Sequence, residues 1–163
     1  MSLLFSGMPS EIAAALRGGA PDANGQAPER KISDGDGVPC RHCLEYVEAG
    51  EPYLVLGYRP FPAPQPYAET GPVFIHAADC PAYEPAQGLP PRERGPQRQQ
   101  ILRGYGADDR IVYGTGMVVR AGDIETEAAA ILKRPEVAYV HMRSATNNCF
   151  TLRIDRGTED WSI

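Results

Sequence analysis

The sequence predicts a single α+β domain over residues 1–163, with a mainly antiparallel sheet and one or two packed helices. The middle of the chain is rich in short β-type segments. The two helical segments are isolated rather than alternating with strands, which disfavours a repeated strand–helix–strand architecture. A chain of 163 residues suits one domain with a sizeable core.

The N-terminal elements come first. An apolar segment at residues 3–5 indicates a short strand. A helix is predicted over residues 10–17, because Ser10 can cap it, Ile12 and Leu16 share a face, and Gly18 can end it. The turn-forming residues 18–30 lack periodicity, so we expect a flexible connector there.

The central segment combines strands with a proline-rich loop. Residues 30–36 suit an edge strand, and residues 53–58 alternate with Leu54, Leu56 and Tyr58 on one side. Residues 60–96 form a Pro-rich loop region, interrupted by a further strand at residues 73–76. The loop either lies on the surface or walls a site.

The C-terminal half holds the clearest helix, at residues 123–134. Asp123 can cap it and Pro135 ends it. Its apolar stripe comprises Ile124, Ala128, Ile131 and Leu132. Short strands are predicted before it, at residues 99–103, 110–113 and 117–119.

The last two predicted strands, residues 137–143 and 149–155, form a hairpin. Placing Arg143 opposite Cys149 gives the two faces different chemistry. The core face then holds Ala138, Val140, Met142, Phe150, Leu152 and Ile154. The polar face holds Tyr139, His141, Arg143, Cys149, Thr151 and Arg153.

Composition and charge limit the partners and the cellular location that we expect for this protein. A net charge of −5 gives no general attraction for nucleic acid or an anionic membrane, so neither is an expected partner. No apolar window is long enough for a membrane helix, and the N-terminus lacks the features of a signal peptide. We therefore expect a cytoplasmic protein, whose 4 Cys are free, metal-bound or reactive rather than paired.

Four residues have the spacing of zinc ligands. Cys40 and Cys43 form a C-x2-C pair, and His76 and Cys80 form an H-x3-C pair. A structural zinc ion takes four S or N ligands, commonly as two close pairs brought together by the fold. The alternatives are four unconnected residues or a redox C-x2-C pair, for which no helix clearly begins at Cys40.

The polar hairpin face is a second candidate site. Arg143 can bind a small anionic ligand, His141 can act as an acid or base, and Cys149 can act as a nucleophile. In this alternative the protein is an enzyme acting on a small anionic substrate, with Arg41 helping to hold the anion. The structural alternative is an outer sheet face exposed to water or covered by a loop.

Several segments together resemble a bacterial family known as domain of unknown function 1203. The resemblance rests on Pro39–Leu44, Gly50-Glu51, Pro66-Tyr67, Gly71–His76, Arg103–Tyr105, and Tyr139–Arg143 with Cys149. It implies a small, uncharacterised bacterial cytosolic protein with no assigned activity. We therefore favour a binding or structural module stabilised by one zinc ion, with the enzyme as the alternative.

Overall fold

The computed structural model describes residues 2–95, 98–158 and 161. They divide into two compact units. The inserted unit is Gly7–Tyr83, and the terminal unit is formed by the described residues before Gly7 and after Tyr83. The prediction of a single domain over residues 1–163 stays a prediction.

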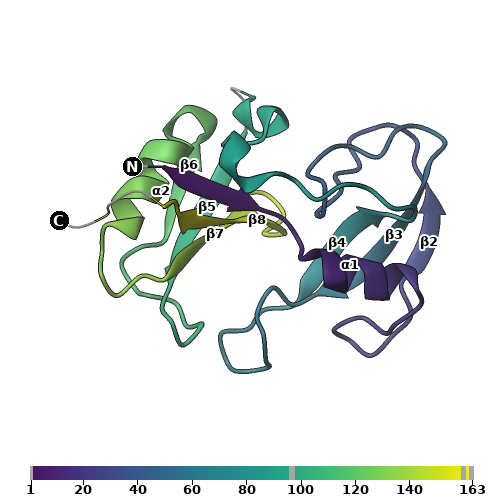
Figure 1. The fold of residues 1–163 in the computed structure, drawn as a ribbon, viewed down its shortest axis with the longest axis horizontal. Helices are drawn as coiled ribbons and strands as arrows, with labels where there is room; N and C mark the ends of the chain where they lie inside the picture. The colour runs from purple at the N-terminus through teal and green to yellow at the C-terminus, as the bar shows by residue number, and fades with distance from the viewer. Residues whose placement is uncertain (1, 96–97, 159–160, 162–163) are drawn as a thin grey trace. The chain divides into compact units, whose positions relative to one another are not determined.

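The terminal unit contains a five-stranded sheet in the order β1-β8-β7-β5-β6, with every neighbouring pair antiparallel. Figure 1 shows the purple β1 beside the yellow β8, so the first and last strands are neighbours in this sheet. The strands are β1 (Leu3–Ser6), β5 (Gln99–Tyr105), β6 (Met117–Arg120), β7 (Tyr139–Ser144) and β8 (Phe150–Arg156). The α+β class is confirmed. The strand predicted at 110–113 is wrong, since the described chain there makes only an isolated bridge between Ile111 and Tyr105.

Helix α2 (Ile124–Leu132) buries the predicted apolar stripe, whose members are at most 4% exposed. Asp123 precedes the helix, as predicted, but makes no capping side-chain bond to any described residue. The reason is local: residues Ala121–Asp123 already form a 3-10 turn, η3, that leads directly into the helix. Two further 3-10 turns, η1 (Pro85–Gln87) and η2 (Pro91–Arg94), lie in the Pro-rich region.

The hairpin of β7 and β8 forms, but the predicted register is wrong. Met142 pairs with Leu152 and Val140 with Ile154, and a bulge then places Phe150 opposite Arg143. The bulge adds one residue to β8, so Phe150 changes face and its ring lies 4.9 Å from the ring of His141. Beyond the bulge the pairing is shifted by two residues from the prediction, which keeps Val140, Met142, Leu152 and Ile154 on one buried face as predicted. Strict alternation could reveal neither the two-residue shift nor the extra residue.

The inserted unit contains a three-stranded antiparallel sheet in the order β2-β3-β4 and one helix. The elements are α1 (Ser10–Arg17), β2 (Glu29–Ile32), β3 (Pro52–Tyr58) and β4 (Gly71–His76). Leu54, Leu56 and Tyr58 are buried along β3, as predicted. The predicted edge strand forms as β2, although it ends at Ile32 rather than residue 36.

Helix α1 has the predicted bounds but a different N-terminus. Pro9 occupies the cap position, while Ser10 is the first helical residue and bonds to His42 instead. Leu16 is buried, whereas Ile12 is 38% exposed. The connector predicted at 18–30 holds a turn in which the Asp22 carboxylate accepts from the backbone N–H of Asn24, Gln26 and Gly57. No helix in the described part of the chain is long and apolar enough to cross a membrane.

Candidate metal centre

The first ligand pair lies in a tight turn of the inserted unit. The backbone N–H of Cys40 donates to Glu45 at 2.8 Å, and that of Leu44 donates to the Cys40 carbonyl at 2.9 Å. These bonds fold the four residues from Cys40 to Cys43 back on themselves. Both thiols are buried, with Cys40 fully inaccessible to solvent and Cys43 7% exposed.

The second pair is placed by the end of a strand. His76 is the last residue of β4, and Cys80 follows after three residues. The turn of the first pair is joined to this strand by the backbone N–H of Arg41, which donates to the Phe74 carbonyl at 2.8 Å. The N–H of His76 also donates to Cys40 Sγ at 3.3 Å. The sheet therefore brings together two pairs that are far apart in the sequence.

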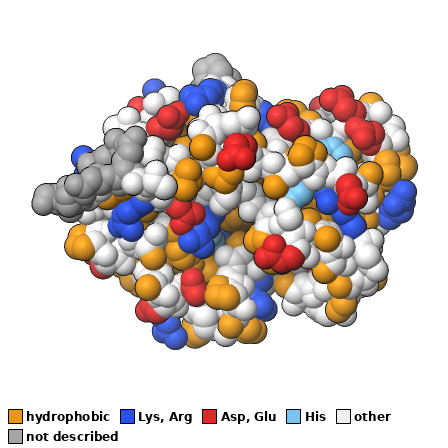
Figure 2. All heavy atoms as spheres, in the orientation of Figure 1, with side chains coloured by type: hydrophobic (Ala, Val, Ile, Leu, Met, Phe, Trp, Pro, Cys, Tyr) orange, Lys and Arg blue, Asp and Glu red, His pale blue; other side chains and the backbone are white. Residues whose placement is uncertain are grey.

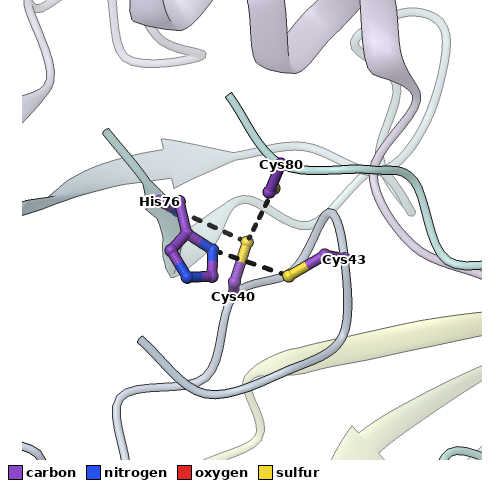
Figure 3. Close-up of side chains that lie close together, drawn as sticks. All are labelled: Cys40, Cys43, His76 and Cys80. Carbon is purple, nitrogen blue, oxygen red and sulfur yellow. Dashed lines mark hydrogen bonds between the residues drawn. The ribbon is translucent and has the colours of Figure 1, made fainter. Parts of the chain in front are cut away.

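The four ligand atoms converge on one point (Figure 3). They all lie within 4.8 Å of one another. A zinc ion with Zn–S bonds of about 2.3 Å requires tetrahedral S–S edges of about 3.8 Å and S–N edges of about 3.5 Å. Cys40 Sγ and Cys80 Sγ are 3.9 Å apart, and Cys43 Sγ lies 3.5 Å from His76 Nδ1. The residues present therefore fit a tetrahedral S₃N metal site.

Thiol ionisation points to the same chemistry. The pKa of Cys40 is lowered to about 3, chiefly because the Cys43 thiol donates a hydrogen bond to it. Burial raises this pKa, whereas hydrogen bonds from backbone N–H groups, including that of His76, lower it further. The pKa of Cys43 is raised because its proton is held in that bond, and because it is buried beside the Cys40 thiolate. Burial and the charge of Cys40 also raise the pKa of Cys80. Only Cys40 is therefore ionised readily, and ionising all three sulfurs this close together would require a cation such as a divalent metal.

Arg17 of helix α1 and His42 of the Cys40 turn contact the second pair from outside the group of four. Arg17 donates through Nε to the His76 carbonyl at 2.9 Å and through Nη2 to Cys80 Sγ at 3.0 Å. The buried His42 has Nδ1 at 3.1 Å from Cys80 Sγ and Nε2 at 2.9 Å from Ser10 Oγ. Such partners orient ligands and adjust their charge. Local spacing could not assign Ser10, Arg17 and His42 to the site, because 32 or more residues separate them from their partners.

The turn carries backbone strain. Leu44 has a φ of 62°, in the left-handed region that side chains with a Cβ rarely adopt, at a cost of about 1–2 kcal/mol. Gly7 packs directly behind this turn, and a Cβ there would collide with the Arg41 carbonyl oxygen and lie 3.1 Å from Leu44 Cδ2. A conformation held against such strain commonly marks a functional site.

A family model described as "Protein of unknown function (DUF1203)" matches residues 37–156. The chain belongs to this family. The match covers most of the chain and includes the four candidate ligands, whereas Ser10 and Arg17 lie before it. No curated protein and no solved structure matches the chain.

The second candidate site of this DUF1203 protein lies in its terminal unit. His141 and Arg143 are both on β7 and both buried. Cys149 lies in the loop before β8, where its thiol bonds to the Asn147 carbonyl at 3.7 Å, so it does not face Arg143 as predicted. Burial, followed by the charges of Arg143, Arg153 and Arg103, holds the pKa of His141 well below its usual range. The uncharged imidazole is therefore favoured at neutral pH.

Aromatic rings surround His141 in this DUF1203 protein. The rings of Tyr105 and Tyr139 are stacked with centroids 5.4 Å apart, and each lies within 5.0 Å of the His141 ring. Arg41, the remaining candidate, lies in the turn of the inserted unit and is 8% exposed. Its joint role with Arg143, and the catalytic roles of His141, Arg143 and Cys149, stay predictions.

Proposed function

We propose that this protein is a small binding or structural module in which Cys40, Cys43, His76 and Cys80 hold one structural zinc ion. The supporting observation is the convergence of four ligand atoms, from two separate segments, to within 4.8 Å. Thiolate and imidazole ligands suit zinc, and four protein ligands leave no open position for water or substrate. The ion's role is then to stabilise the fold.

A cytoplasmic bacterial location agrees with this proposal, since a reducing compartment keeps the four thiols available for metal. The proposal includes no polyanionic partner such as nucleic acid. The net charge is −5, and acidic and basic side chains are interspersed on the face seen in Figure 2.

Metal content tests the proposal directly. Protein purified without a metal-affinity tag is analysed by elemental mass spectrometry, and its reactive thiols are counted. We expect about one zinc per chain, with Cys149 as the reactive thiol. Protein that carries no metal and has four titratable thiols would contradict the proposal.

A pair of variants separates the metal site from cysteine content in general. Cys40→Ser removes a buried ligand and is expected to lower the melting temperature and abolish stoichiometric zinc. Cys149→Ser changes a thiol in a loop outside the four-residue group. It is expected to keep both the melting temperature and the zinc content of the parent. Equal stability of the two variants would contradict a structural role for the metal.

A further inference from the structure

A row of basic side chains crosses the five-stranded sheet of the terminal unit. Arg103 on β5 is paired with His141 on β7, and His141 is in turn paired with Arg153 on β8. Directly paired residues project to the same face of a sheet, so these three side chains stand in line. Arg143 follows two residues after His141 along β7 and projects to the same face. We call these four residues the basic cluster.

Placing like charges in this row is unfavourable. Arginines that flank a histidine across adjacent strands repel any positive charge on it, so they add to the effect of burial in lowering the pKa of His141. Burial adds to the cost, because Arg143 is only 4% exposed and a guanidinium cannot lose its charge. Asp155 pairs with Arg153 and offsets part of this charge, and an anion bound at the same face would offset it further.

Two of the guanidinium groups, those of Arg143 and Arg153, are held in place by hydrogen bonds. Arg153 donates to both Asp155 carboxylate oxygens at 2.7–2.8 Å and lies 4.0 Å from the centroid of the Tyr139 ring. Arg143 donates from Nη1 to the Asn148 carbonyl at 3.1 Å. Charged groups fixed in advance lose little freedom when they bind a ligand.

We propose that the basic cluster binds a small anion that carries a phosphate group. A single carboxylate is satisfied by one guanidinium fork, whereas a tetrahedral phosphate offers oxygens to several forks and carries more charge. The cluster is graded in exposure: the side chain of Arg153 is 44% exposed and Arg103 is half-buried, while His141 and Arg143 lie deeper. The outer arginines therefore meet the anion first. This site does not depend on the zinc proposal, because it lies in the other unit.

Calorimetric titration of the purified protein with inorganic phosphate and pyrophosphate tests this site, with chloride at matched ionic strength as the blank. We expect saturable binding to one site that weakens as salt rises. Arg103→Gln and Arg153→Gln are each expected to weaken it by about tenfold or more, since a hydrogen bond to a charged group is lost. Arg120→Gln, on the exposed end of β6, is the matched control and is expected to bind as the parent does.

A second measurement on the unmodified chain guards against variants that fold poorly. The ¹⁵N-resolved Nε–Hε signals of several arginines are expected to shift together on addition of phosphate, with the same saturation point as the heat signal. Absence of saturable binding and of these shifts would overturn the proposal. Equal binding by the parent and the two cluster variants would also overturn it, and would identify an adventitious surface ion only.

Discussion

Replacement of Arg17 by Gln tests whether helix α1 is part of the metal centre. Arg17 touches both members of the second ligand pair, through the His76 carbonyl and Cys80 Sγ. Its side chain is only 10% exposed, so solvent screens these contacts weakly. A tetrahedral zinc site with three thiolates would carry a net charge of about −1, which the guanidinium would compensate.

The expected loss follows from these contacts. Removal of an outer-shell partner lowers metal affinity by about 10–100-fold, which corresponds to about 1.4–2.7 kcal/mol. The assay is competition for zinc between the protein and a chromophoric chelator at fixed pH. Arg17→Lys keeps the charge but lacks the planar fork that reaches two acceptors, so we expect an intermediate affinity.

The control is Arg94→Gln, which removes an arginine from an exposed pair with Glu125 in the terminal unit. It should leave zinc affinity unchanged. If Arg17→Gln binds zinc as tightly as the parent and Arg94→Gln, the contacts of Arg17 do not support the ligands and the reasoning fails. Affinity rather than melting temperature is the deciding measurement, because a helix contact can stabilise the fold without a metal.

Two further predictions concern stability, measured by chemical denaturation. Gly7→Ala is expected to lower the free energy of unfolding by about 1–3 kcal/mol, because the added Cβ would collide with the Arg41 carbonyl. The control is Gly71→Ala, whose Cβ meets open space and which should be neutral. Equal effects of the two substitutions would contradict this packing. The pKa of His141 is lower in the folded state than the usual value of about 6.5, so the unfolded chain takes up the proton first and stability falls as pH drops below that value. His141→Gln should remove this part of the acid destabilisation, at most about 1.4 kcal/mol per pH unit, and an unchanged pH slope would contradict it.

Short-range patterns predicted much of the fold. The 3.6-residue periodicity of α2 and the alternation along β3 depend on neighbours in the sequence, and both elements form with the expected buried residues. The grouping of Cys40, Cys43, His76 and Cys80 was predicted because each pair has the local spacing of metal ligands, and the four lie close together in the structure. What local spacing could not predict is how the two pairs are brought together, which the hydrogen bond from Arg41 in the turn to Phe74 on β4 accomplishes.

The errors have physical causes at particular residues. The bulge near Phe150 is one extra residue that alternation cannot reveal, and it moved an aromatic ring next to His141. Ser is a residue type favoured at helix N-caps, yet the hydroxyl of Ser10 bonds to His42, which is 32 positions away in the sequence. Arg103 became part of the basic cluster only through the pairing of β5 with β7. In each case a tertiary contact decided the role of the residue.

The small size of the inserted unit explains why a metal would matter there. It spans fewer than 80 residues, with one 8-residue helix and a three-stranded sheet whose edge strand β2 is wholly exposed. Units of this size commonly need a disulfide or a metal to supplement their core. Zinc removal is therefore expected to loosen this unit first, beginning with the segments that carry ligands and α1.

Hydrogen exchange on the whole chain, with and without chelator, tests this expectation. Amides of α1 and β4 should exchange faster after chelation, because the ligand pair and the contacts of Arg17 no longer hold them. Amides of β7, at the centre of the five-stranded sheet, serve as the internal control and should change little. Uniform acceleration in both units would mean that the metal supports the whole chain, and no acceleration in α1 or β4 would mean that the four ligands do not stabilise the fold.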